Sequence, residues 1–79
     1  MMPRYFFDFT SDGEAYDDPA GVEFDGDEEA VRQLLPVLAH SAHDFVPVNE
    51  RQTLSLVLRG PTGRQIARAV MAWRVERVS

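Results

Sequence analysis

A single helical stripe between strand-like segments is the pattern that most constrains this chain. Apolar residues recur every three to four positions from Val31 to Phe45, which is the spacing of an amphipathic helix. We expect this helix to run from about Asp27 to about His43, with the acidic residues of its first turn favoured by the helix dipole. Pro36 interrupts it, and because the stripe continues in phase on both sides, we expect a kink rather than a break.

The segment before the helix contains alternation typical of strands. Residues 3–10 place aromatic side chains on one face and are expected to form the first strand. Residues 11–20 have the composition of a turn followed by a loop. Residues 21–24 are expected to form a short strand, at a sheet edge because Pro19 precedes them.

The segment after the helix predicts a hairpin. Residues 53–59 alternate cleanly between leucine and more polar residues, and the turn residues at 60–63 follow them. Residues 64–78 fit either a strand or a helix, and the preceding turn favours the strand. The alternation slips near Ala69 and Val70, where we expect a bulge.

Together these elements predict an α+β fold. The order β-β-α-β-β corresponds to a two-layer sandwich, in which an antiparallel sheet of about four strands carries one helix packed on one face. A chain of 79 residues hides only about 60% of its unfolded surface when it folds alone. We therefore expect residues 1–79 to form a single small domain.

The composition excludes several kinds of chemistry. The chain has no Cys, and all 8 of its Lys-plus-Arg residues are Arg. Disulfides, thiolate nucleophiles, lysine Schiff bases and the usual phosphate-binding loop are therefore excluded. The sequence has neither a basic and apolar leader nor a long apolar stretch, so we expect a soluble, cytoplasmic protein without membrane contact.

The net charge of −5 is unevenly distributed. Residues 1–30 hold ten acidic residues and one Arg, a net charge of −9, whereas residues 31–79 hold seven Arg and three acidic residues, a net charge of +4. Opposite charges attract over a distance set by screening. We expect the basic half to pair with the acidic half, within one chain or between two copies.

Three possible sites for chemistry are weak. The acidic residues 12–29 fit a calcium loop in neither register, because Asp17 replaces the glycine when the loop starts at Asp12, and Ala30 and Pro36 replace the glycine and the bidentate glutamate when it starts at Asp25, so a solvated loop is favoured. His40 and His43 could share a metal, but no third ligand stands at a recognisable spacing, and histidines near a helix C-terminus are also favoured by its dipole. Ser41 and Asp44 complete the residue types of a hydrolase triad, but one helical turn cannot provide its geometry. We expect no catalytic, cofactor-binding or metal-binding residue and no enzymatic activity.

The second face of the sheet is a candidate interface because one helix covers only the first. An apolar and aromatic patch bordered by charge is typical of an interface. The candidate interface residues are Phe6, Val57, Val70, Arg4, Arg59 and Arg74. We expect a non-enzymatic protein-interaction or structural module that forms a homodimer through this face or through an edge strand, or that binds a small protein partner.

A nucleic-acid-binding accessory protein is the alternative function. Its binding site would be the arginine-rich residues 59–77, in which Trp73 could stack on a base. The acidic half of the chain would repel a polyanion, so nucleic acid is the less expected partner.

Several short segments of the sequence are similar to segments that recur in one family of small proteins. The opening MPRYFFD at residues 2–8 is the most specific, and the others are residues 17–18, 21–23, 30–32, 35–36, 63–64 and 75–78. The chain therefore resembles a family of small alphaproteobacterial proteins of unknown function, known chiefly from rhizobia. The resemblance implies the same order of strands and helix and assigns no catalytic residue. Relatives often carry a longer charged linker after the helix and an acidic residue before the glycine of the last turn.

Overall fold

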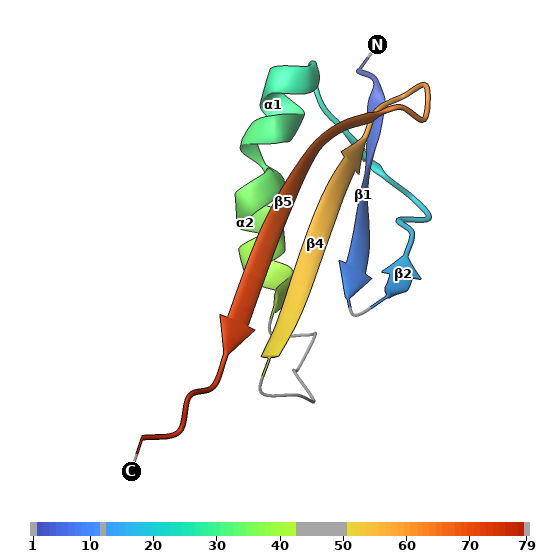
Figure 1. Ribbon diagram of the computed structural model, residues 1–79. Coiled ribbons are helices and arrows are strands. Elements are labelled where there is room, and N and C mark those ends of the chain that lie inside the picture. The colour runs from blue at the N-terminus through green and yellow to red at the C-terminus, as the bar shows by residue number, and fades with distance from the viewer. Residues whose placement is uncertain (1, 12, 43–50, 79) are drawn as a thin grey trace.

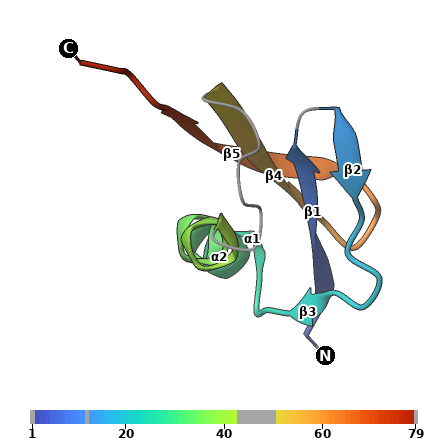
Figure 2. The same cartoon turned by 90° about the horizontal axis from the view of Figure 1, so that it is seen from below.

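An open antiparallel sheet with one bent helix forms the fold. The computed structural model describes residues 2–11, 13–42 and 51–78. The elements in these residues are β1 (Arg4–Ser11), β2 (Glu14–Tyr16), β3 (Val22–Glu23), α1 (Asp27–Arg32), α2 (Leu34–Ser41), β4 (Arg51–Arg59) and β5 (Gln65–Arg74). The strand order is β2-β1-β4-β5, and β3 pairs with the first residues of β1 (Figure 1). The helix lies on one side of the sheet (Figure 2), which confirms the α+β fold with a helix on one face.

The helix bends between α1 and α2, three residues before Pro36. Gln33 separates the two helical segments, and its N–H donates to the carbonyl oxygen of Ala30 at 3.1 Å. Pro36 is the third residue of α2, where a missing N–H breaks no intrahelical bond. The expected kink is therefore confirmed. The described helix ends at Ser41, and the expected end at His43 lies outside the described residues.

The core lies between α2 and the face of the sheet that carries the β4 leucines. These leucines have no exposed surface, as the alternation of residues 53–59 predicts. The core consists of Tyr5, Phe7, Ala30, Leu34, Leu38, Leu54, Leu56, Leu58 and Ala69. The helix start is also tied to the sheet, because the Tyr5 hydroxyl donates to Asp27 Oδ1 at 2.6 Å. That hydrogen bond, together with burial, raises the pKa of Tyr5 above 10.0.

The C-terminal segment forms a strand, as the hairpin pattern predicts. β5 ends at Arg74, so residues 75–78 do not continue it. The bulge expected near Ala69 and Val70 is wrong, because both residues pair in regular register with β4. The register shift lies at the turn end, where Leu58 pairs with Ala67 and Arg59 with Gln65. Small alanines face the helix on β5, and their size obscures the alternation in the sequence.

The three-residue strand β2 was not expected. The sequence predicts a turn and loop here, but Gly13, with φ of +85°, allows a tight turn that returns the chain along β1. Ser11 then pairs with Glu14, and Phe9 with Tyr16. A strand this short, with exposed residues throughout, has no alternation to detect. The short strand expected at residues 21–24 is confirmed as β3.

Candidate binding surfaces

The strand register places all six candidate interface residues on the face opposite the helix. Phe6 pairs with Arg59, Ser55 with Val70, and β1 residues of even number share this face. The face therefore carries the residues that alternation assigns to it. We call it the outer face, and its residues include Arg4, Phe6, Asp8, Glu23, Ser55, Val57, Arg59, Arg68, Val70 and Arg74.

The apolar residues at one end of the outer face are covered by the chain itself. The Arg59 guanidinium lies over the Phe6 ring, 4.4 Å from its centroid. Its Nε and Nη2 donate to the two carboxylate oxygens of Asp8 at 2.9 and 3.4 Å. Val57 is 9% exposed, whereas Val70 is 55% exposed. Of the three apolar candidates, Val70 is thus the one with a largely exposed side chain.

All three candidate arginines have partners within the chain. Arg59 pairs with Asp8, which joins the basic half to the acidic half as expected. Arg4 donates to the carbonyl oxygen of Ala20 at 2.8 Å and pairs with Glu23 at 3.5 Å. The third, Arg74, pairs with Glu76 in the segment that follows β5. Of these three pairs, Arg59–Asp8 joins the two halves of the charge division, whereas Arg4 and Glu23 both belong to the acidic half and Arg74 and Glu76 both belong to the basic half.

A half-buried hydrogen-bond network centred on Asp18, which we call the edge network, holds the edge of β1 between β2 and β3. The Asp18 carboxylate accepts hydrogen bonds from the N–H groups of Phe7, Ala20 and Gly21 at 3.2, 3.1 and 3.0 Å. The Asp18 N–H donates to Asp8 Oδ1 at 2.9 Å. Gly21 has a φ of +75°, and a Cβ there would lie 2.7 Å from the carbonyl oxygen of Tyr5. The loop therefore needs both the carboxylate and the glycine.

The two carboxylates of this network are held in their charged form. Burial has the largest single influence and raises the pKa of Asp18, but the three backbone N–H groups together outweigh it and leave the pKa below 3.8. Burial likewise raises the pKa of Asp8, while Arg59 and the Asp18 N–H lower it further than burial raises it. The network therefore requires both acids to be ionised.

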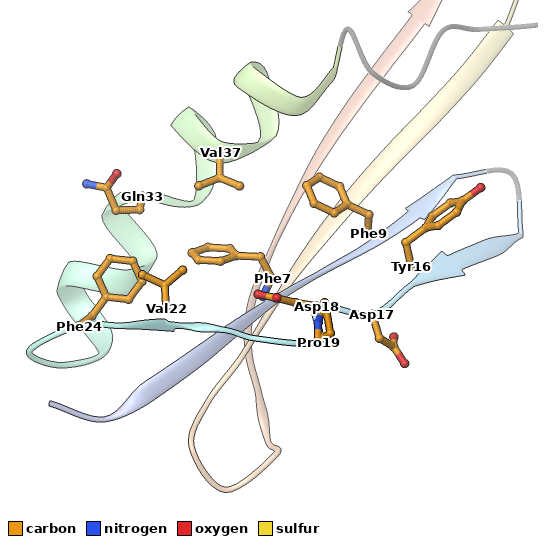
Figure 3. A pocket seen from close by; sticks show the side chains of 10 residues that line it. All are labelled: Phe7, Phe9, Tyr16, Asp17, Asp18, Pro19, Val22, Phe24, Gln33 and Val37. Carbon is orange, nitrogen blue, oxygen red and sulfur yellow. The ribbon is translucent and has the colours of Figure 1, made fainter.

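An aromatic groove lies on the helix side of β1, where it opens toward β2 and β3. Its volume is about 600 Å³. Phe7 and Phe9 extend from β1 into it, with Val37 of α2 on one side and Tyr16 at the far end (Figure 3). We call this surface the aromatic groove, and it is lined by Phe7, Phe9, Tyr16, Asp17, Asp18, Pro19, Val22, Phe24, Gln33 and Val37.

Ring packing sets one wall of the aromatic groove. Phe24 meets Phe7 edge to face, with 6.0 Å between ring centroids, and meets Tyr5 in the same way at 5.9 Å. The sequence analysis missed the groove. One signal in the sequence could have predicted it: residues 1–24 contain more aromatic side chains than one short helix can cover.

The possible metal site formed by His40 and His43 lies partly outside the described residues. His40 lies on α2 with an exposed side chain, while His43 and Asp44 are not described. Within residues 2–11, 13–42 and 51–78, no three His, Asp or Glu side chains are grouped to hold a metal ion. In the same part of the chain, no helix is long and apolar enough to cross a membrane.

The bent helix on an antiparallel sheet places the chain among small α+β proteins. Its sequence matches the family described as Domain of unknown function (DUF6894) over residues 4–72, from the start of β1 into β5. The chain therefore belongs to this family. No curated protein and no solved structure matches it.

Proposed function

We propose that this protein is a non-enzymatic protein-interaction module that forms a homodimer by pairing β5 with β5 of a second copy. The observation that supports it is the position of β5, a ten-residue strand at the end of the strand order. Among the described residues, β5 pairs with β4 alone. The N–H and C=O groups on the other edge of such a strand are available to another strand.

The backbone groups on the open edge can be assigned by alternation. The Phe7 N–H points to Asp18 on the β2 side of β1, so the even-numbered residues of β1 point toward β4. Through the register, even-numbered residues of β4 bond to β5, as Leu56 does to Ala69. The residues of β5 that face the open edge are therefore Arg68, Val70, Ala72 and Arg74.

A two-fold pairing centred on Val70 keeps the arginines of β5 apart. It uses β5 residues 66–74, with Val70 opposite Val70 of the second copy. Within β5, this register sets Arg68 opposite Ala72 and Arg74 opposite Ile66 of the second copy, so no two arginines of the strand face each other.

The two neighbouring registers bring like charges together. A pairing centred on Ala69 sets Arg74 opposite Arg64 of the second copy. A pairing centred on Met71 sets Arg68 opposite Arg74 of the second copy. Like charges directly opposite each other are destabilising, so the register centred on Val70 is favoured.

Size-exclusion chromatography with light scattering tests the homodimer. We expect twice the 8.9 kDa mass of one chain at micromolar concentration. Val70→Pro removes an N–H from the open edge without removing a bond to β4, and is expected to give the mass of one chain. Val70→Thr, which keeps the N–H and the β-branched side chain, should remain dimeric. A wild-type mass of 8.9 kDa, or a Val70→Pro dimer with a native circular dichroism spectrum, would contradict the proposal.

A nucleic-acid-binding accessory protein is the second candidate. It is supported by the outer face, on which the four arginines Arg4, Arg59, Arg68 and Arg74 outnumber the acidic residues Asp8 and Glu23. Fluorescence anisotropy with labelled single-stranded DNA and RNA tests it. Binding should fall steeply with salt and be lost when Arg64→Glu and Arg68→Glu are combined. Absence of binding at low salt would remove this candidate.

Origin and location also belong to the proposal. The resemblance of residues 2–8 supports an alphaproteobacterial origin. The cytoplasmic location stays a prediction, which fractionation of the native cells with immunodetection would test.

A further inference from the structure

We propose that the aromatic groove binds a basic and apolar segment of a partner protein. This goes beyond the homodimer, because the groove lies along β1 and β2, at the other end of the strand order from β5. The two surfaces can therefore be occupied independently. The proposal depends on the lining of the groove, its charge and its shape.

The lining calls for an apolar partner. Phe7, Phe9 and Val37 form its floor and one side (Figure 3), and Tyr16 is 46% exposed. The helix packs mainly on β4 and β5, so Phe9 and Tyr16, toward the β2 end of the sheet, are covered less than the buried Phe7. An exposed apolar surface bordered by polar groups is typical of a binding site.

The charge of the groove calls for a basic partner. Asp17 and Asp18 are among its lining residues, and none of the lining residues is Arg, Lys or His. Hydrogen bonds to backbone N–H groups lower the pKa of Asp18, so it is charged at neutral pH. The nearby Arg59 pairs with Asp8 and also interacts electrostatically with Asp17 and Asp18, so one arginine faces three carboxylates and a net negative charge remains. A cation beside an aromatic and acidic surface gains both ionic and cation–π attraction.

The shape of the groove favours a protein segment over a small molecule. The groove is open to solvent rather than enclosed. Small-molecule sites bury most of their ligand, roughly 70–90% of its surface. A segment of a larger partner can leave one side outside the groove, because the rest of that partner covers it.

The β1 edge beside the groove is closed to strand pairing. The Asp18 carboxylate already accepts the Phe7 N–H at 3.2 Å. A partner segment therefore cannot extend the sheet at this position, and must be recognised through its side chains. This distinguishes the groove from the open edge of β5.

Selection from a phage-displayed library of random short peptides tests the proposal. Panning on the wild-type protein should enrich peptides that combine Lys or Arg with aromatic or aliphatic residues. The most enriched peptide is then synthesised and its affinity measured by calorimetry. Val37→Trp, which fills the groove, should weaken binding at least about tenfold. Leu35→Trp is the matched control on the same helix, because Leu35 is 67% exposed and does not line the groove.

Charge is tested with a second matched pair of variants. Asp17→Asn should weaken the peptide and reduce the dependence of its affinity on salt. Glu28→Gln on α1 removes the same charge away from the groove and should leave the affinity unchanged. Both variants alter exposed side chains, so folding is expected to be preserved.

Three results would overturn the proposal. One is enrichment of no peptide, or of acidic peptides. Another is equal binding to wild type and Val37→Trp. The third is conversion of a wild-type dimer to single chains by Val37→Trp, which would assign the groove to a second copy. Val70→Pro should bind the peptide as wild type does, so failure of the homodimer and failure of this site are distinguishable.

Discussion

The two faces of the sheet are made by the same strands but are stabilised in different ways. On the helix side, Leu54, Leu56 and Leu58 are fully buried beneath α2. On the outer face no helix is present in the described residues, and Arg59 covers Phe6 while its charge is balanced by Asp8. An apolar residue in a strand pattern therefore need not form an exposed patch, because a long arginine on the next strand can cover it.

The largest expected effect comes from comparing the loss of stability caused by a substitution on the helix side with that caused by one on the outer face. Leu56→Ala should lower the free energy of unfolding by about 2–5 kcal/mol, because it leaves a cavity in the core. Ser55→Ala, one residue away on the outer face, should change it by less than about 0.5 kcal/mol. Urea denaturation followed by circular dichroism measures both. Equal effects would mean that the two faces do not differ in packing.

The edge network that joins the two faces should have the next largest effect. Asp18→Ala removes the acceptor of three backbone N–H groups and should cost about 1–3 kcal/mol. Asp18→Asn keeps an acceptor oxygen and should cost less. The same denaturation experiment decides, and a larger loss for Asp18→Asn would argue against the proposed hydrogen bonding.

Acid should weaken the hydrogen-bond network of Asp8 and Asp18 and leave the packing on the helix side of the sheet intact. The pKa values of Asp8 and Asp18 are lowered by folding, so their stabilisation is complete above the ordinary value near 3.8. It is lost as pH falls through the lower pKa values of the folded state. The free energy of unfolding should therefore decrease below about pH 4. In the double variant Asp8→Asn with Asp18→Asn this decrease should be reduced, and an unchanged decrease would place its origin elsewhere.

The smallest expected effect distinguishes two arginines within the outer face. Arg59→Met loses the cation over Phe6 and the pair with Asp8, and should lower the midpoint of thermal unfolding slightly. Arg68→Met removes an exposed arginine of β5 and should leave the midpoint unchanged. A larger loss for Arg68→Met would show that Arg59 is not what covers this face.

Periodicity predicted the elements whose residues repeat a pattern. The β4 alternation, the helical stripe and the kink at Pro36 all follow from side-chain spacing and from the missing proline N–H. β2 did not follow, because Gly13 sets it through a turn rather than through a pattern. The bulge was misplaced because alanines on β5 make room for the helix and hide the alternation.

The candidate surfaces were predicted only in part. Alternation correctly placed Phe6, Val57 and Val70 on one face. It could not show that Arg59 covers Phe6, since that contact depends on side-chain conformation. The aromatic groove depends on where the helix lies across the strands, and a periodic pattern identifies the buried side of a helix but not its lateral position.

Disulfide trapping tests the pairing of β5 with β5 most directly. The chain contains no Cys, so a single introduced thiol can bond only to its copy in a second chain. In the register centred on Val70, the two Val70→Cys residues face each other with Cα atoms about 5.5 Å apart, within disulfide reach. Ala72→Cys lies on the same edge but away from the two-fold axis. We expect rapid disulfide-linked dimers for Val70→Cys and few for Ala72→Cys. Equal or negligible cross-linking of both variants would contradict the proposed pairing.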